Sequence, residues 1–211
     1  MIKKNASGYF GIIVSIFVLL VTIGSIRYLD AEIAVKVMRF LLSVRTLHKV
    51  TKHIPDFLPH LVGIGTILMW IIYFYRSRHN INDIETHFLR LAATALPVAY
   101  LLKSFFKFMF GRTGPRSWLI DNRPFEFHWF NKIWSGSFPS GHMTVFAAFG
   151  AAVLFYYPEY RRLVIILLVL LGIALIGTDY HFLSDVIAGT YLGFVTTYLL
   201  QHIFEKKQAK I

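Results

Sequence analysis

The chain has 211 residues, of which 56% are hydrophobic, 16% are charged and none is cysteine. A soluble domain usually contains about 45–50% apolar residues. Here they gather in blocks long enough to cross a bilayer, where roughly 20 helical residues span the hydrocarbon. Because several blocks are apolar on all sides, they argue against a soluble helical protein. The lack of cysteine excludes disulfides, thiolate nucleophiles and cysteine metal sites.

Six apolar blocks in chain order predict six transmembrane helices. We therefore expect an all-α integral membrane protein, a single domain over residues 1–211 in which the six helices form a bundle. Pro97 lies inside the third block, where it can kink the helix. The first block follows two lysines as a signal peptide does, but its length and the lack of a clear cleavage site favour an uncleaved span. The blocks cover about residues 9–26, 60–75, 89–110, 142–157, 163–178 and 184–203.

The formal charge of +11 would suggest nucleic acid in a soluble protein. Here most basic residues flank the apolar blocks, which indicates membrane orientation and contacts with anionic headgroups, and no nucleic-acid partner is expected. If six spans alternate, both termini lie on a cytoplasmic face. The loops at 111–141 and 179–183 then share the outer face. The short loops and small size of the chain suggest a bacterial inner membrane, whose outer face is periplasmic or exterior. The basic residues on the cytoplasmic face are Lys3, Lys4, Arg76, Arg78, Arg90, Arg161, Arg162, Lys206, Lys207 and Lys210.

The segment between the first two blocks does not fit this charge rule, because residues 27–59 carry six basic side chains and yet lie outside. Within it, residues 31–47 alternate basic and apolar positions at helical spacing. This predicts an amphipathic helix at the membrane interface, lying on anionic headgroups. A helix packed on the protein surface explains the pattern equally well, and the role of residues 31–52 stays open. The apolar face would hold Ile33, Val37, Phe40, Leu41 and Val44, with Lys36, Arg39 and Arg45 largely off it.

The loop at 111–141 ends in Pro139, Ser140, Gly141 and His142, directly before the fourth block. Free backbone N–H groups and the helix dipole favour an anion at such a helix start. A serine hydroxyl can donate, glycine lets an anion approach the backbone, and histidine can supply a proton near physiological pH. The alternative is an ordinary helix cap formed by Ser140, and the motif alone does not decide between the two.

His181 and Asp185 lie directly before the sixth block and are four residues apart, so they share a face if the helix begins near His181. A carboxylate bonded to one imidazole nitrogen fixes the tautomer and leaves the other nitrogen free as a nucleophile. The alternative is a His–Asp pair that closes a helix end, and the pair taken alone favours this alternative.

Three cations, Lys107, Arg112 and Arg116, cluster where the third block ends. Lys107 lies in an apolar stretch, where an ionisable residue is costly and usually functional unless it snorkels to the interface. The two arginines can clamp phosphate oxygens or bind lipid headgroups. Alternating spans bring this cluster, the P-S-G-H segment and the His–Asp pair to one membrane face, where their chemistry is complementary.

These segments resemble the motifs of the type 2 phosphatidic acid phosphatase family, K-x6-R-P, P-S-G-H and S-R-x5-H-x3-D. The second motif is complete at residues 139–142, and the third keeps H-x3-D at His181 and Asp185. The resemblance covers about residues 103–193. It implies a membrane phosphatase whose site is similar to that of vanadium haloperoxidases. The resemblance also implies that the phosphatase itself requires no metal and no other cofactor.

The chain departs from the family pattern at two arginines. Gly114 stands where the first motif has its arginine, and Ala174 and Leu175 replace the Ser-Arg of the third. Arg112 is the candidate to take over phosphate binding, with Arg116 or Arg123 supplying the missing charge.

The resemblance implies that His181 attacks phosphorus, that Asp185 holds the ring, and that His142 protonates the leaving oxygen and then activates water. The groups expected to bind the phosphate are Lys107, Arg112, Arg116, the Ser140 hydroxyl and the Gly141 N–H.

The expected function is therefore hydrolysis of a lipid phosphate or diphosphate through a phosphohistidine. Undecaprenyl diphosphate, lipid A phosphate, phosphatidylglycerophosphate and phosphatidate all fit, and the oligomeric state is open. The alternatives are a lipid phosphotransferase and a non-catalytic protein that binds lipid phosphates. A transporter is disfavoured because, apart from Lys103 and Lys107, the apolar blocks hold few ionisable residues deep inside them.

Overall fold

The structure is a computed structural model that describes residues 2–43, 58–130 and 136–208, and over these ranges it is almost entirely helical. The chain forms α1 (Ile2–Gly24), a π-helical turn η1 (Ser25–Leu29), α2 (Asp30–Ser43), α4 (Leu58–Arg78), α5 (Ile84–Phe110), α6 (Pro115–Leu119), α7 (Gly141–Tyr156), a 3-10 turn η3 (Pro158–Tyr160), α8 (Arg161–Gly177) and α9 (Leu183–Gln208).

Five helical segments are long and apolar enough to cross a membrane: Gly11–Ser43, Leu58–Arg78, Ile84–Phe110, Pro158–Gly177 and Leu183–Lys206. Large apolar side chains on the outer helices α1, α4 and α8 are exposed, as contact with lipid requires. All six predicted blocks are confirmed as helices. The fourth, α7, has 16 residues and is about 24 Å long at 1.5 Å per residue, so a sixth span stays a prediction.

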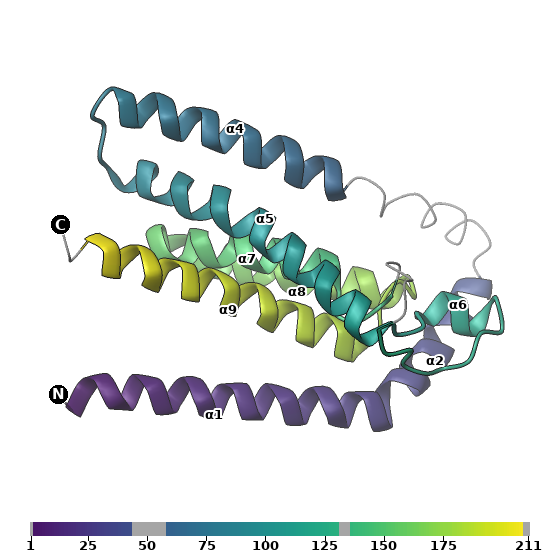
Figure 1. The fold of residues 1–211 in the computed structure, drawn as a ribbon. Helices are drawn as coiled ribbons and strands as arrows, with labels where there is room; N and C mark the ends of the chain where they lie inside the picture. The colour runs from purple at the N-terminus through teal and green to yellow at the C-terminus, as the bar shows by residue number, and fades with distance from the viewer. Residues whose placement is uncertain (1, 44–57, 131–135, 209–211) are drawn as a thin grey trace.

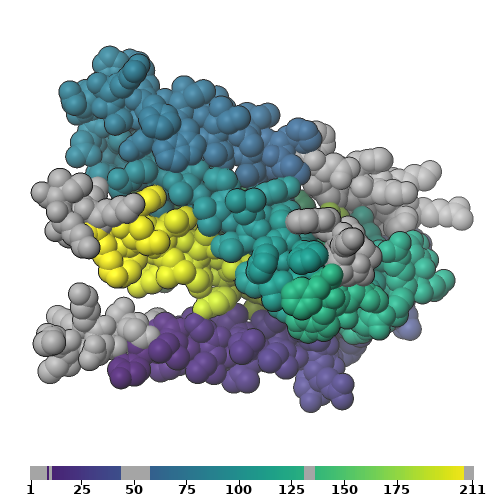
Figure 2. All heavy atoms as spheres, viewed as in Figure 1, coloured from purple at the N-terminus to yellow at the C-terminus, as the bar shows by residue number. Residues whose placement is uncertain are grey.

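The helices lie side by side, with the start of α1 and the end of α9 at one end of the bundle and α2 and α6 at the other (Figure 1). In the centre, α7 packs against both α9 and α5. Helix α4 covers α5 on one side and α1 lies along α9 on the other, so these two form opposite edges of the molecule (Figure 2). The core helices therefore converge on the end that carries the polar loops.

Two glycines allow α9 to approach α7 closely. A Cβ at Gly189 would stand 2.5 Å from the Ser140 carbonyl oxygen, and one at Gly193 would stand 2.3 Å from that of Thr144. Backbone atoms cannot move aside as a flexible side chain can. Small residues one helical turn apart let membrane helices pack backbone to backbone, and here they set the position of the α7 start against α9.

Helix α5 carries the chain to the site end of the bundle. The Asp83 side chain caps its start by accepting from the Thr86 N–H at 3.0 Å. The helix continues through Pro97 and ends at Gly111, whose φ of 51° is left-handed. Glycine adopts this conformation without the steric cost that a side chain would add, and the chain turns there into the loop that carries Arg112.

The predicted amphipathic segment forms α2, but its buried side differs from the predicted face. Ala34, Met38 and Leu41 are buried, whereas Phe40 is 62% exposed. Leu41 belongs to both faces. The apolar pattern alone does not state which side of α2 faces the bundle, because the π-helical turn before it rotates the whole helix by roughly 100° relative to α1. Residues 44–52 of the segment lie outside the described ranges, and the position of α2 at a membrane interface stays a prediction.

Candidate active site

His181 lies in the short loop between α8 and α9 and is 3% exposed. Its Nδ1 is 3.5 Å from a carboxylate oxygen of Asp185 and 3.3 Å from the hydroxyl of Ser137. Its Nε2 is buried and has no hydrogen-bond partner among the described residues. The ring is thus held through one nitrogen while the other is left with an unused lone pair or proton.

Asp185 lies in the first turn of α9, and its side chain is fully buried. Its Oδ2 accepts from the Phe182 N–H at 2.9 Å and from the Ser137 hydroxyl. Its Oδ1 accepts from Arg112 at 2.7 Å. Ser137 was not among the residues singled out in the sequence, because it stands before the P-S-G-H segment and follows no motif.

The two histidines come together at the site end of the bundle. The ring centroids of His142 and His181 are 6.5 Å apart, with an interplanar angle of 64°. Tyr180 contacts both rings, at 5.6 Å and 5.0 Å between centroids. The sequence predicted that these imidazoles converge although they stand 39 positions apart (181 − 142), and in the structure one phosphoryl group could contact both.

Ser140 is the N-cap of α7, which was the structural alternative for this residue. Its Oγ accepts from the Met143 N–H at 3.4 Å, and its own N–H donates to the Asp185 carbonyl at 3.0 Å. The cap therefore joins the starts of α7 and α9. The hydroxyl proton of Ser140 can still donate to an anion, and the adjacent Gly141 lies against the side chain of Lys103.

Lys107 and Lys103 bring positive charge from α5 to the histidines. Lys107 is close enough for its charge to act on both His142 and His181. The side chain of Lys103 runs past Gly141, and its ammonium stands 3.9 Å above the ring centroid of Tyr100. Lys103 was noted in the sequence only as an ionisable residue within an apolar block.

Arg112 is placed differently from its predicted role. Its side chain is 1% exposed, and its two terminal nitrogens donate at 2.7 Å to Asp185, to Asp30 and to the Ser184 hydroxyl. The guanidinium also stands 4.3 Å from the ring centroid of Phe182. Its terminal nitrogens are therefore engaged behind the His–Asp pair by two carboxylates and a hydroxyl, while its buried Nε has no hydrogen-bond partner among the described residues. Phosphate binding by Arg112 is untested, and this arrangement does not favour it.

Arg116 is likewise engaged by the protein. Its guanidinium donates to the Thr178 carbonyl at 3.2 and 2.7 Å and stands 5.5 Å from the Tyr180 ring centroid. Arg116 thus braces the loop that carries His181. Arg123, the other candidate for the missing charge, is exposed on the loop after α6. The guanidinium groups of Arg112 and Arg116 are thus bound to carboxylates and to a carbonyl. Among the described residues, the other predicted phosphate-binding groups, Lys107, Ser140 and Gly141, lie near the two histidines.

Two ionisable groups in the α8–α9 loop have displaced pKa values. Burial lowers the pKa of His181, the hydrogen bond to Asp185 acts in the opposite direction, and the charge on Lys107 lowers it further. A neutral imidazole with a free nitrogen is the form that can act as a nucleophile. Burial raises the pKa of Asp179 to about 7, against the effect of Arg116.

Comparison with known proteins places this sequence in a family. The sequence profile of the PAP2 superfamily matches residues 88–209. The chain belongs to the PAP2 superfamily. The matched region runs from early in α5 to the end of α9 and includes both histidines, Asp185, Ser137 and the cations of α5, but not α1, η1, α2 or α4. With its five long apolar helices, this PAP2 protein is a multi-pass membrane protein.

Two curated relatives of this PAP2 protein are both named lipid A 1-phosphatase. They come from Rhizobium etli and Rhizobium johnstonii, and each is 44% identical over 57 residues, or 27% of this chain. The matched stretch spans 25% and 23% of their lengths, about a quarter. A PAP2-type phosphatidylglycerolphosphate phosphatase from Bacillus subtilis is a similar solved structure, with 20% identity, 92% of this chain and 96% of that chain covered, and a TM-score of 0.47.

Proposed function

We propose that this PAP2 protein is a metal-independent phosphatase that hydrolyses a phosphate ester or diphosphate of a membrane lipid. One observation carries the proposal: two imidazole rings lie 6.5 Å apart, and the Nε2 of His181 has no partner among the described residues. A buried nitrogen without a partner is costly unless a ligand engages it. The lysines of α5 supply the positive charge that a phosphate requires.

The proposed reaction has two steps. In the first, the lone pair of His181 Nε2 attacks phosphorus, the P–O bond to the lipid breaks, and His142 gives its proton to the leaving oxygen. In the second, His142 takes a proton from water as the oxygen attacks phosphorus, and the P–N bond breaks. Asp185 accepts from the Nδ1 proton throughout and stabilises the positive ring. Lys107, the Ser140 hydroxyl and the Gly141 N–H face the charge on the phosphoryl oxygens.

The position of the site and the names of the relatives support the proposed substrate class. The histidines lie at one end of a bundle whose outer helices are covered with apolar side chains, so a lipid can present its headgroup while its chains stay in the bilayer. The relatives named lipid A 1-phosphatase make lipid A phosphate a candidate. Undecaprenyl diphosphate, phosphatidylglycerophosphate and phosphatidate remain candidates on chemical grounds.

The test is phosphate release from a panel of these four lipids by the protein purified in detergent. We expect release from at least one lipid, inhibition by vanadate, and full activity in the presence of a metal chelator. His181→Ala should abolish turnover, and His142→Ala should lower it by about 10²–10⁴-fold, the usual contribution of one acid–base group. A phosphohistidine trapped from ³²P-labelled substrate should vanish in His181→Ala.

His79→Ala is the matched control, because His79 is exposed at the other end of the bundle, where its ring is tilted against that of Tyr75 with 4.5 Å between centroids. This variant should keep wild-type turnover. Normal hydrolysis by His181→Ala would rule out the mechanism. Transfer of the label to a second lipid in preference to water would identify a phosphotransferase, and tight binding of lipid phosphate without turnover would identify a binding protein.

We further propose that the site faces the periplasm or exterior and that both termini are cytoplasmic. The chain has no cysteine, so single cysteines can be labelled without background. Asp121 lies after α6 at the site end, and Ser77 lies near the end of α4 at the other end, and both are exposed. In intact cells, a membrane-impermeant maleimide should label Asp121→Cys and not Ser77→Cys. The reverse pattern would contradict this orientation.

A further inference from the structure

A carboxylate from outside the PAP2-matched region enters the site. Asp30 is the first residue of α2, and its side chain is fully buried. It accepts from Arg112 at 2.7 Å, from the Ser184 hydroxyl at 2.5 Å and from the Ser184 N–H at 3.0 Å. Asp30 stands 154 positions before Ser184 and lies outside residues 88–209. An ionisable residue buried in a membrane protein is usually functional, and here its partners are known.

The local backbone aims Asp30 inward. The chain leaves α1 through the π-helical turn η1, and the Asp30 N–H bonds to the Ser25 carbonyl. Such a turn inserts one residue into the helical register, and π turns of this kind occur frequently at functional sites. Arg27, three positions earlier, is exposed, whereas Asp30 is 1% exposed. The turn therefore places Arg27 on the exposed side of the helix and Asp30 on the side that faces the site.

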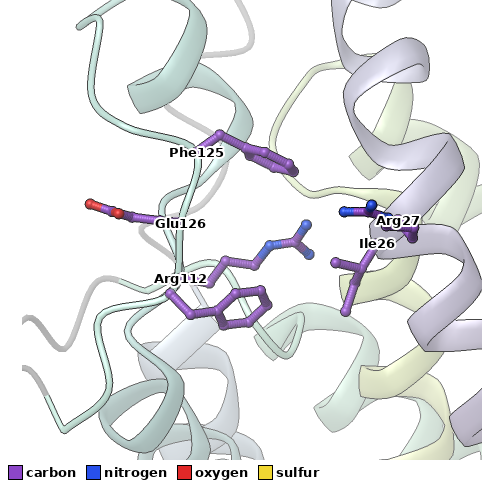
Figure 3. Close-up of a pocket in the computed structure, with 6 residues that line it drawn as sticks. Ile26, Arg27, Arg112, Phe125 and Glu126 are labelled. Carbon is purple, nitrogen blue, oxygen red and sulfur yellow. The ribbon is translucent and has the colours of Figure 1, made fainter.

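Arg112 lies between the N-terminal helices and α9, with few carboxylates close to it. A cavity of about 310 Å³ separates η1 from the loop of Phe125 and Phe127, and Arg112 extends across it toward η1 (Figure 3). The carboxylate of Glu126, one residue from both rings, points away from Arg112 (Figure 3). The carboxylates that Arg112 meets are Asp30 on one side and Asp185 on the other. Arg112 thus links Asp30 of the N-terminal helices to Asp185, the carboxylate that holds His181.

The net charge of Asp30, Arg112 and Asp185 determines how Asp30 affects the ring of His181. With both carboxylates ionised, Asp30, Arg112 and Asp185 sum to −1 + 1 − 1 = −1. Without Asp30 the guanidinium would neutralise Asp185 alone, and the sum would be zero. A nearby negative charge stabilises the imidazolium that forms when His181 is phosphorylated or protonated. Asp30 thus offsets Arg112, so that Arg112 can hold Asp185 in place without cancelling its charge.

We propose that Asp30 is a positioning residue of the site, which holds Arg112 against Asp185 and keeps a net negative charge beside the ring of His181. This inference rests on the proposed phosphohistidine chemistry for its effect on rate, but not for its effect on the ring itself. The other charged or titratable groups that face His181 are Asp185 from α9, Lys107 from α5, His142 from α7 and Tyr180 from its own loop.

The first experiment compares Asp30→Asn with Asp83→Asn. Asp83 also pairs with an arginine, at 2.5 Å from Arg76, but it lies at the other end of the bundle. We expect Asp30→Asn to lower kcat by about 10–100-fold, as found for residues that orient the ligands of metal sites, with little change in KM. The acid limb of the kcat/KM profile, which reports the free enzyme, should move to lower pH. Asp83→Asn should change neither.

The second experiment needs no turnover. In protein with ¹⁵N-labelled histidine, the pKa of His181, assigned with His181→Gln, should fall in Asp30→Asn, where the charge sum is zero. It should rise in Arg112→Gln, where the sum is −2, and return toward the wild-type value in the double variant, where the sum is again −1. A merely structural Asp30 predicts no such order. The double variant also removes the guanidinium that Asp30→Asn leaves without its second carboxylate, so it tests the proposal if Asp30→Asn alone does not fold.

The outcomes separate this inference from the proposed function. If wild-type protein releases no phosphate but the order of the His181 pKa values in the wild type and the three variants holds, the phosphatase proposal fails and the role of Asp30 stands. If His181→Ala is inactive while Asp30→Asn keeps wild-type turnover and an unchanged His181 titration, the role of Asp30 is overturned and the phosphatase proposal stands. Reduced turnover in Asp30→Asn with an unchanged titration also overturns it.

Discussion

The two ends of the bundle each hold an arginine between two carboxylates, yet the two groups differ in surroundings. At the α4–α5 turn, Arg76 pairs with Asp83 at 2.5 Å and Glu85 at 3.0 Å, and the two acid side chains are 50% and 55% exposed. At the site end, the side chains of Arg112 and its two acids are at most 1% exposed. Solvent screens the first group, so it contributes little beyond closing a turn.

Burial gives the second group a different role. Unscreened charges act strongly on their neighbours, and removing one member changes the net charge that is buried beside the ring. The ring of His181 lies beside this group, so a change in the net charge of the group should change the pKa of His181. The comparison shows that burial, more than the kind of residue, decides whether an arginine between two acids can influence a reaction. Because close packing keeps this group buried, substitutions that disturb the packing at the site end should have the largest effect.

The largest effect is expected from Gly189→Ala. The added Cβ would stand 2.5 Å from the Ser140 carbonyl oxygen, so α7 and α9 must separate. Overpacking of this kind costs about 1–3 kcal/mol, and a misplacement near 1 Å at a reacting centre costs on the order of 10²-fold in rate. Thermal unfolding in detergent and phosphate release should both record the loss.

Gly65→Ala is the matched control at an open position. Gly65 lies inside α4, and a Cβ there meets no atom within 4 Å. Alanine is favoured over glycine in a helix by roughly 0.5–1 kcal/mol, so this variant should unfold at the same or a slightly higher temperature and keep its activity. Equal losses in the two variants would show that close packing at the site end has no special weight.

A smaller effect is expected from Asp179→Asn and concerns the pH dependence of stability. Burial raises the pKa of Asp179 from 3.8 to about 7 in the folded protein. The folded state then binds the proton more tightly than the unfolded state, so the contribution of Asp179 to stability falls as the pH rises from about 4 to 7. Asp179→Asn should remove this fall. Asparagine also tolerates the left-handed φ of 50° at this position.

Asp83→Asn is the control of opposite sign. The bond from the Thr86 N–H, together with Arg76, lowers the pKa of Asp83 from 3.8 to about 2. Its contribution to stability is present above pH 4 and is lost as the pH falls toward 2, so this variant should keep the wild-type slope between pH 4 and 7. Melting temperatures measured across pH 3–8 distinguish the two variants. If wild type and Asp179→Asn have parallel profiles from pH 4 to 7, Asp179 is not buried as described.

Local signals in the sequence were enough to predict the helices and the centre of the site. Each apolar block coincides with one helix, except for one or two residues at the ends of the first, fourth and fifth blocks. The cost of leaving backbone groups unpaired in lipid leaves few alternatives to a helix. His181 and Asp185 are four residues apart, and a single helical start places them together. The approach of His142 followed from alternating spans and from the resemblance, and it needed no knowledge of side-chain contacts.

Contacts between distant segments were decided only by the tertiary structure. Asp30 and Ser137 stand 155 and 48 positions before Asp185, and no spacing rule connects them to it. Arg112 looked equally suited to phosphate or to carboxylate, because its donors fit either anion. The choice depends on which acids the packing of α2 and α9 buries next to it. A sequence states which groups can pair, whereas the close approach of helices, set here by residues such as Gly189 and Gly193, determines which of them meet.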